Sequence, residues 1–255
     1  MGKFIKKVHL NVRRVVAVRP HWTVFAGLLV SLHSVESKEI NLIARHYNAD
    51  TNQLLYVEKI KLNMINKMRT DENYTFFFPS GKSFGNLKTW NSDSAKRPSY
   101  EFRDKRDKRV EGVDFYSKNQ FRIHVQRNGK STKEEKKFRI KKDIITIPGL
   151  NNFITMQLDQ ILKKKSVVFK VALPSELDSF AFTMKFNRLI TLQGERCVKV
   201  KMVTTNPVLR LFLRPIYLVY SLESNLIMQY QGIYFIRDPK QGWTGYYVIA
   251  KYKKK

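Results

Sequence analysis

Apolar and polar residues alternate with a period of two along most of the chain. In residues 180–186, FAFTMKF, one phase holds the large apolar side chains of Phe180, Phe182, Met184 and Phe186. A strand with this pattern has one apolar face. The same alternation predicts further strands at residues 39–45, 54–62, 74–78, 84–90, 121–126, 167–173, 198–202, 216–220, 226–236 and 244–252.

Turn-forming residues separate several of these segments. Residues 79–82, PSGK, combine a proline, which restricts one backbone dihedral angle, with a glycine, which allows a positive one. Asn128-Gly129 is a strong hairpin signal. SLESN and DPKQG separate the last three segments, and Gly232 inside a strand pattern predicts a bulge or bend. These signals favour antiparallel neighbours.

One segment has the spacing of an amphipathic helix. Leu150, Ile154, Leu158 and Ile161 follow one another at intervals of four, four and three residues. That spacing places them on one helix face. Three lysines, residues 163–165, follow where the helix dipole favours cations. Asn206-Pro207 predicts the cap and first position of a second, short helix over residues 208–212.

About ten strands and one principal helix predict a mainly β fold. We expect a curled antiparallel sheet, a half-barrel or open barrel, packed on that helix. Residues 91–111 are polar and charged, so we expect a long exposed loop there. The strands carry more apolar rows than one helix can cover. The sheet must therefore curl on itself, pair with a second layer or leave a cleft.

Composition supports a folded domain and narrows the chemical classes of partner that the chain could bind. The chain has 255 residues, of which 43% are hydrophobic, and a formal net charge of +27. Such a charge attracts polyanions, and the candidates are nucleic acid, anionic lipid surfaces and phosphorylated glycolipids. The single cysteine, Cys197, excludes an internal disulfide and a multi-cysteine metal site.

The first residues have the order of an export signal. Six basic residues precede the first acidic one, Glu36, and residues 22–32 form an uncharged apolar run of eleven. That run has the length of a signal-peptide core and is short of the roughly 20 residues of a spanning helix. We expect a signal peptide or short membrane anchor at residues 1–37 and one β-rich domain at 38–255. The alternative is a buried N-terminal segment of a cytosolic protein.

Export would place the protein in the periplasm, or anchored in the inner membrane facing the periplasm. The leader holds six basic residues and one acidic residue, so the remaining chain keeps a net charge of +22. The mature part is therefore basic in its own right.

Residues with catalytic spacing are sparse. The sequence has no glycine-rich phosphate loop, nucleophile elbow or zinc-protease motif. We interpret His46 and His124 as solvated strand histidines. Lys199 and Lys201 share the phase of Cys197, which favours either a reactive thiol of lowered pKa or a half-buried structural one. No carboxylate pair has a register for acid–base catalysis, so we expect no enzyme, no cofactor and no metal.

Basic runs and tyrosines leave two interpretations each open. The runs at residues 103–109, 133–142, 163–165 and 253–255 form either an anion-binding rim or a solubilising surface. For the rim we single out Lys105, Arg106, Lys163 and Lys164. Strand tyrosines at positions 230, 234, 246 and 247 either stack nucleic-acid bases or pack in the core. Given the leader, nucleic acid is the minor interpretation.

The C-terminal segment, residues 209–252, resembles the closing part of a group of uncharacterised exported bacterial proteins. The shared features are Pro215-Ile216, a strand ending at Tyr220, and Tyr230-Gln231-Gly232-Ile233. Residues 44–58, ARHYNADTNQLLYVE, and 103–113, RDKRDKRVEGV, are also similar to that group. The group implies no catalytic residues. More distantly, a curled sheet around a helix is similar to the lipoprotein-carrier half-barrel fold, a likeness that does not determine function.

The leading hypothesis is a non-enzymatic envelope protein that binds a hydrophobic or amphiphilic ligand, a lipid or a lipoprotein. The expected pocket residues are Phe180, Phe182, Met184, Phe186 and Leu158, although the same row also fits a plain core. An anionic membrane surface is a second expected partner. The alternatives are a membrane-tethered structural or scaffold module and a cytosolic nucleic-acid-binding protein. The sequence leaves the oligomeric state open.

Overall fold

The described residues form one large β-sheet with few helices. In the computed structural model these residues are 37–90, 94–127, 129, 132–141, 143–237 and 245–255, and they belong to one compact unit, Val35–Lys255. The expected leader, residues 1–37, lies almost wholly outside them. The elements are β1 (Ser37–Asn48), β2 (Leu54–Ile65), β3 (Met68–Phe77), β4 (Ser83–Trp90), β5 (Ser99–Asp104), β6 (Arg109–Ser117), β7 (Gln120–Gln126), β8 (Glu134–Arg139), β9 (Ile144–Ile145), α1 (Gly149–Leu162), β10 (Val167–Leu173), the 3-10 turn η1 (Pro174–Glu176), β11 (Asp178–Leu192), β12 (Glu195–Thr204), α2 (Pro207–Phe212), β13 (Ile216–Ser221), β14 (Ile227–Arg237) and β15 (Gly245–Lys254).

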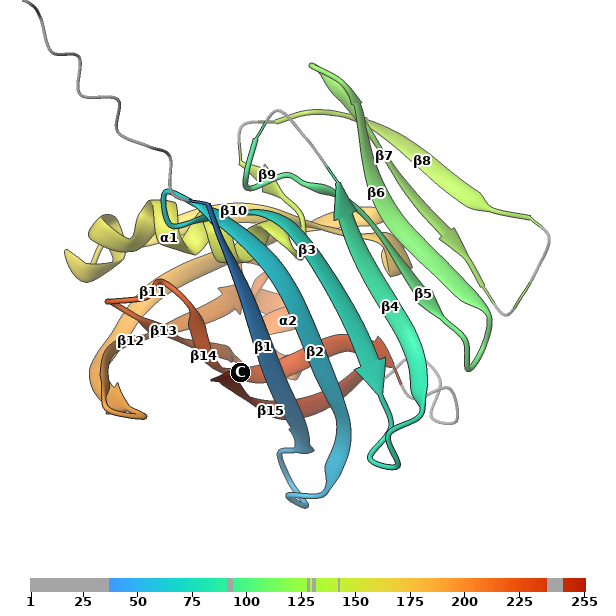
Figure 1. The fold of residues 1–255 in the computed structure, drawn as a ribbon. Helices are drawn as coiled ribbons and strands as arrows, with labels where there is room; N and C mark the ends of the chain where they lie inside the picture. Colours follow the sequence, from blue (N-terminus) through green and yellow to red (C-terminus); the bar gives the residue numbers. More distant parts are fainter. Residues whose placement is uncertain (1–36, 91–93, 128, 130–131, 142, 238–244) are drawn as a thin grey trace, which may run out of the picture. The chain divides into compact units, whose positions relative to one another are not determined.

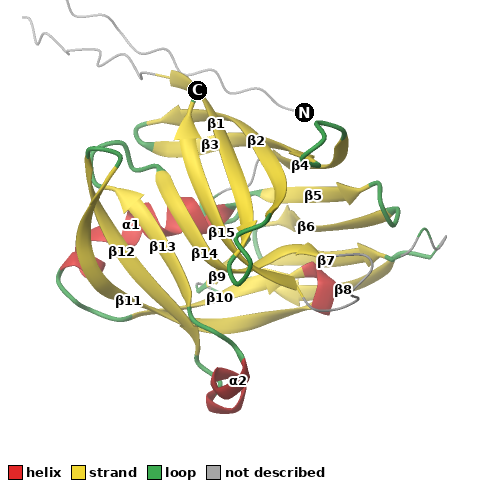
Figure 2. Cartoon of the chain, turned by 90° about the horizontal axis from the view of Figure 1, so that it is seen from below, coloured by secondary structure: helices red, strands yellow, loops and turns green. Residues whose placement is uncertain are grey.

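The sheet consists of two meanders, which are joined where the first strand of the described chain pairs with the last. The order is β8-β7-β6-β5-β4-β3-β2-β1-β15-β14-β13-β12-β11-β10-β9, and β9–β10 is its parallel pair. β1 pairs with β15, with Leu42 opposite Lys254. Figures 1 and 2 show the sheet curled, with β1 to β4 on one side and β10 to β13 on the other. The expected curled, unclosed sheet is confirmed.

The predicted number of strands was wrong, because the described residues form fifteen strands and not about ten. β5, the turn into β6 and the first three residues of β6 lie in the segment predicted as an exposed loop. Tyr100 and Phe102 are buried there. Only alternate positions of a half-buried strand need apolar residues, so dense charge at the other positions and in the turn hid both strands. β8, rich in lysine and glutamate, is an edge strand, where charge prevents pairing with other chains.

The period-two rows predicted from the sequence point into the concave face. Ile40, Leu42 and Ala44 of β1 are buried, as are Ile60 and its phase partners on β2. Several aromatic rings of this face pack edge to face; Phe76 and Phe102, for example, lie 5.6 Å apart between centroids. This geometry is the favourable one for aromatic pairs.

Both predicted helices are present. α1 buries Phe153, Ile154 and Ile161 against the sheet, which matches the predicted apolar face. α2 begins after Asn206, whose Oδ1 accepts hydrogen bonds from the backbone N–H groups of Val208 and Leu209. Within the part of the chain that is described, neither helix has the length and apolar content needed to cross a bilayer.

Candidate ligand pocket

A pocket of about 400 Å³ opens at one end of the curled sheet, and we call it the mouth pocket. It lies where β1 begins and β15 ends, between the β2–β3 turn, the β11–β12 turn and the β13–β14 loop. Its lining residues are Lys38, Ile40, Leu42, Met64, Asn66, Lys67, Gln193, Glu195, Ser224, Leu226, Ile227, Met228, Tyr252 and Lys254.

One wall of the mouth pocket is apolar. Ile40, Leu42 and Met64 come from the inward rows of β1 and β2, and their side chains are buried. Leu226 of the β13–β14 loop and Ile227 at the start of β14 add a second apolar group. The wall is thus an extension of the hydrophobic core to the end of the sheet.

Three lysines line the same pocket. Lys38, Lys67 and Lys254 are exposed, and within the described ranges none has an ion-pair partner. The carboxylate of Glu195 accepts hydrogen bonds from the hydroxyl groups of Ser221 and Ser224. The pocket therefore combines an apolar wall with an excess of positive charge.

Tight hairpins position the polar residues of the mouth pocket. Asn66 and Lys67 connect β2 to β3 with φ of 50° and 64°, the double left-handed geometry of a two-residue hairpin turn. Gln193 and Gly194 connect β11 to β12 in the same way. The Gln193 side-chain amide donates a hydrogen bond to the Tyr252 carbonyl at 3.0 Å, which ties that hairpin to β15.

Behind the pocket lies a set of buried polar side chains, His46, Glu58, Arg69, Glu72, Tyr74 and Tyr234, which we call the polar cluster. His46 Nε2 lies 2.7 Å from Glu58 Oε2, and both side chains are fully buried. The Tyr234 hydroxyl lies 3.1 Å from each oxygen of Glu58. Tyr56, opposite His46 on β2, stacks on the imidazole with ring centroids 4.2 Å apart.

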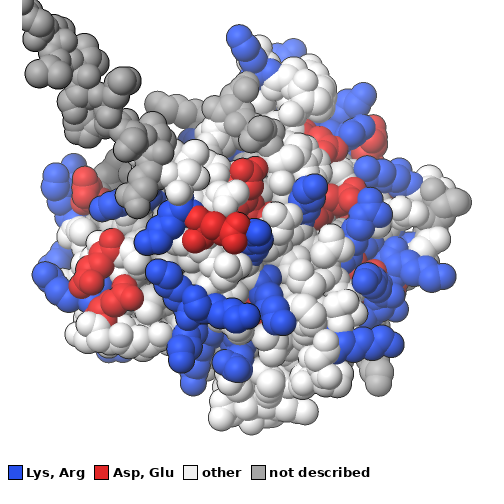
Figure 3. All heavy atoms as spheres, viewed as in Figure 1, with Lys and Arg blue, Asp and Glu red and all other residues white. Residues whose placement is uncertain are grey.

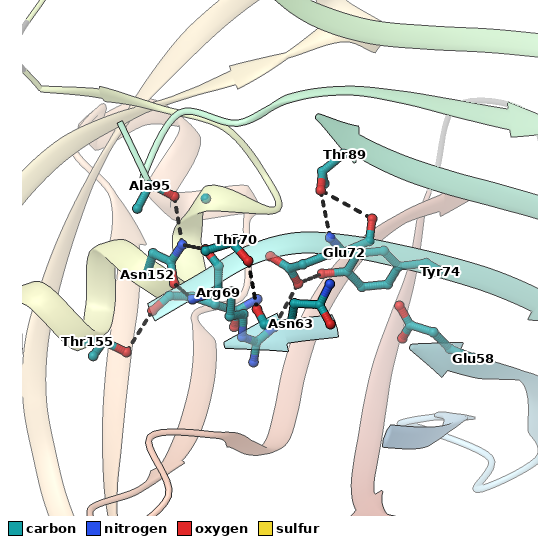
Figure 4. Close-up of polar contacts among 12 residues, drawn as sticks. Glu58, Asn63, Arg69, Thr70, Glu72, Tyr74, Thr89, Ala95, Asn152 and Thr155 are labelled. Atoms are coloured by element: carbon teal, nitrogen blue, oxygen red, sulfur yellow. Dashed lines mark hydrogen bonds and ion pairs between the residues drawn. The ribbon is translucent and has the colours of Figure 1, made fainter. Parts of the chain in front are cut away.

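The second half of the polar cluster surrounds Glu72 (Figure 4). Arg69 Nη1 donates to Glu72 Oε2 at 2.9 Å, and the Tyr74 hydroxyl donates to the same oxygen. Burial and the neighbouring Glu72 charge raise the pKa of Tyr74 well above its ordinary value. Burial opposes the charge of Arg69, but the nearby Glu72 carboxylate raises its guanidinium pKa overall. Arg69 therefore stays a cation inside the fold.

Asn152 of α1 connects the helix to this region. Its Oδ1 accepts from the Arg69 backbone N–H at 2.8 Å, and its Nδ2 donates to the carbonyls of Arg69 and Ala95, each at 2.8 Å (Figure 4). The Tyr220 hydroxyl donates to the neighbouring Asn151. Over the described residues, no group of three or more His, Cys, Asp or Glu side chains has the geometry to hold a metal ion.

The structure contradicts our interpretation of both strand histidines as solvated. His46 continues the inward row of β1, so it lies in the polar cluster. His124 points to the outer face of β7 but is 1% exposed. Gly112, its partner on β6, has no side chain, and a Cβ there would lie 3.0 Å from the His124 ring. The ring occupies that space, with Nδ1 3.3 Å from Asp114 Oδ2.

Cys197 has the environment of an inert thiol. Its side chain is buried against Val219 and Met228. Burial raises the thiol pKa, and Glu195 adds to the shift, although a backbone hydrogen bond opposes it. A reactive cysteine needs the opposite shift, so of the two interpretations the structural thiol fits the site.

The predicted pocket residues lie near α1 and outside the mouth pocket. Met184 is fully buried, and Phe182, Phe186 and Leu158 pack half-buried against the main core. Phe180, at the beginning of the row, is also half-buried.

A stack of rings connects this row to the helix. The Phe182 ring lies 6.2 Å from Phe169, which lies 4.8 Å from Phe153 of α1. Sequence reasoning missed the mouth pocket itself, because its lysines are single residues on separate elements. The sequence signal that could have indicated this pocket was Lys38, which lies in the same inward-facing row of β1 as Ile40 and Leu42.

The four predicted rim residues lie on two distant elements. Lys105 and Arg106 form part of the β5–β6 turn, where Arg106 pairs with Asp104 at 2.5 Å. Lys163 and Lys164 follow α1, and Figures 1 and 2 place α1 and that turn on opposite sides of the sheet. Figure 3 shows basic side chains spread over the face seen in Figure 1, with acidic side chains between them.

Comparisons with known proteins identify no family for this chain. No protein-family model matches it, and no curated protein matches it. One similar solved structure is the crystal structure of a β-barrel-like protein of the domain of unknown function DUF1849 from Brucella abortus. The two chains share 8% identity, the match covers 87% of this chain and 96% of the other, and the TM-score is 0.43.

Proposed function

We propose that this chain binds an anionic amphiphile in the mouth pocket and catalyses no reaction. The observation that carries the proposal is the combination, in one pocket, of an apolar wall and three lysines without ion-pair partners among the described residues. The ligand class is a lipid, or the acyl group of a lipoprotein, with a carboxylate or phosphate at its head. The sequence predicted the same ligand class, but in a pocket lined by the row from Phe180 to Phe186 and not in the mouth pocket.

The volume of the mouth pocket and the free energy of burying methylene groups both support an acyl chain as its ligand. A volume of about 400 Å³ lies within the roughly 300–1,000 Å³ that small-molecule sites span. Each methylene that leaves water contributes about 0.8 kcal/mol, offset by the cost of ordering the ligand. The lysines discriminate among ligands by charge, because exposed cations attract an anionic head and give nothing to a neutral one.

Binding of a fluorescent C16 carboxylate to the purified full chain tests the proposal. Ser224→Trp places a large ring at the half-buried mouth, and we expect it to weaken binding at least about tenfold by filling the pocket. The triple variant Lys38→Gln/Lys67→Gln/Lys254→Gln should weaken binding about tenfold, since each cation near an anionic group contributes up to about 1 kcal/mol.

The matched control removes three exposed lysines elsewhere, Lys118→Gln/Lys133→Gln/Lys137→Gln, and keeps the same net charge as the test variant. Equal weakening in both triple variants would show that only the total charge matters. Equal affinity of the wild-type chain for the C16 alcohol would also overturn the proposal, because the lysines would then have no role.

We further propose that the protein works in the cell envelope, a proposal that rests on the sequence of residues 1–37. An alkaline phosphatase reporter fused after residue 37 should become active outside the cytoplasm. N-terminal sequencing of the fractionated protein then distinguishes a cleaved signal peptide from a retained anchor. An inactive reporter, with the intact chain in the cytosolic fraction, would contradict export.

A further inference from the structure

The α2 helix presents large apolar side chains to solvent. Val208 is 61% exposed, Leu211 is 82% exposed and Phe212 is 77% exposed. Figure 2 shows α2 projecting from the sheet, clear of the strands. It connects β12 to β13, at the opposite end of those strands from the hairpins of the mouth pocket. α2 therefore contributes no residue to the mouth pocket.

Local hydrogen bonds hold α2 in this exposed position. The Asn206 side chain caps its N-terminus, and the Arg210 guanidinium donates to the Thr204 carbonyl at 3.0 and 3.2 Å. Arg214, just after the helix, pairs with Asp50 in the β1–β2 turn at 2.9 Å. These contacts hold the apolar side chains in an exposed position, with Arg210 among them and Arg214 just after the helix.

The strands that lead to α2 carry uncompensated positive charge. On the outer face of β11 and β12, Lys185 lies opposite Lys201, and Arg188 lies opposite Lys199. We call these four residues the basic strand patch. In the described part of the chain none of them has an ion-pair partner. Burial and the nearby Arg188 lower the pKa of Lys199, as expected for like charges held together.

We infer that α2 and the basic strand patch dock on an anionic lipid bilayer. Exposed apolar side chains beside basic ones are the composition of segments that bind at membrane interfaces, where the apolar groups insert and the cations meet anionic head groups. A second copy of the chain fits the surface poorly. A two-fold interface would bring the basic strand patch against itself, and like charges repel.

A probe at α2 separates this docking from any contribution of the basic residues near the N-terminus. We would label Leu211→Cys with the environment-sensitive dye NBD in a Cys197→Ala background of the full chain. Vesicles rich in phosphatidylglycerol should shift the NBD emission to the blue and increase its intensity at least about twofold. Phosphatidylcholine vesicles should not. The same dye at Lys118→Cys, an exposed site on another hairpin, is the matched control and should not respond.

A pair of variants tests the two components of the surface by vesicle sedimentation. Leu211→Ser/Phe212→Ser and, separately, Lys185→Gln/Lys201→Gln should each weaken partitioning by about tenfold. Sedimentation without an NBD response at position 211 would overturn the inference, because binding would then use another part of the chain. An NBD shift that appears without vesicles as protein concentration rises would also overturn it, in favour of self-association.

Discussion

At the scale of single residues, the inward-facing rows of the strands contain polar side chains as well as apolar ones. His46 lies two positions after Ala44, and Glu58 lies between Tyr56 and Ile60, so both fall in inward rows. Their side chains meet because β1 and β2 pair in register. A buried carboxylate is costly unless its hydrogen bonds are satisfied, and here His46 and Tyr234 satisfy them.

Removing the Glu58 carboxylate should therefore destabilise the fold. We expect Glu58→Ala to lower the free energy of unfolding by about 3 kcal/mol, because it leaves His46 and Tyr234 buried without their partner. Urea unfolding at pH 7 measures the change. Glu39→Ala, on the same sheet but half-exposed beside Lys61, is the control and should be nearly neutral. An equal effect at both positions would contradict the account of the polar cluster.

Lys67 combines an unfavourable backbone conformation with a place in the mouth pocket. Its φ of 64° suits glycine, and Asn-Gly is the preferred pair in this hairpin type. Lys67→Gly should stabilise the chain by up to about 1 kcal/mol and weaken binding of the C16 carboxylate. Lys67→Gln should weaken binding without the gain in stability. Thermal unfolding with ligand titration measures both, and unchanged affinity in both variants would exclude Lys67 from the site.

At the scale of elements, α1 is joined to the sheet by both apolar and polar contacts. Its apolar face was predictable from spacing, whereas Asn152 lies on the same buried face without an apolar signal. Its amide satisfies two carbonyls and one N–H group from separate segments. A helix packed by apolar contacts alone could rotate or slide, and these directional bonds set its position.

The Asn152 contacts give a prediction for this element. Asn152→Ala should lower the free energy of unfolding by about 2–3 kcal/mol, because two buried backbone groups of Arg69 and the part-buried carbonyl of Ala95 lose their partner. Gln160→Ala, on the exposed side of α1, should change it by less than about 0.5 kcal/mol. Chemical denaturation of both variants measures the difference. A neutral Asn152→Ala would mean that apolar packing alone positions the helix.

At the scale of the whole molecule, the curled sheet removes many tyrosines from water. Burial is the main cause that raises their pKa values, and buried carboxylates add to it for several of them. Residues whose pKa is raised well above the ordinary value are Tyr56, Tyr74, Tyr100, Tyr234 and Tyr252. In the unfolded chain the same phenols ionise near pH 10.

This difference makes the fold sensitive to alkali. The folded state holds these phenol protons more tightly, so their contribution to stability is complete below about pH 10 and is lost as the pH rises above it. In a pH titration, absorbance at 295 nm measures tyrosine ionisation and far-UV circular dichroism measures loss of the fold. The buried tyrosines should therefore ionise only as the fold is lost. Complete phenol ionisation near pH 10, with the dichroism unchanged, would contradict the burial of these rings.

The amino-acid sequence by itself determined the class of fold and most of its elements. Alternation, helical spacing, caps and turn residues act over a few neighbouring positions, so they predicted the antiparallel strands, α1 and α2. The local signal failed where charge occupied the outward phase, as in β5, or nearly every position, as in β8. Local patterns also gave the wrong prediction of a solvated His124, because the glycine that makes room for its ring lies on another strand.

Only the tertiary structure decided which distant residues meet. The pairing of β1 with β15 and the curl of the sheet bring Lys38, Lys67 and Lys254 around one pocket, although Lys38 and Lys254 are 216 positions apart in the sequence. No local pattern encodes that proximity, because it depends on the summed twist of many strand pairs. The same curl buries the polar cluster, and the connection between β12 and β13 is what leaves α2 exposed.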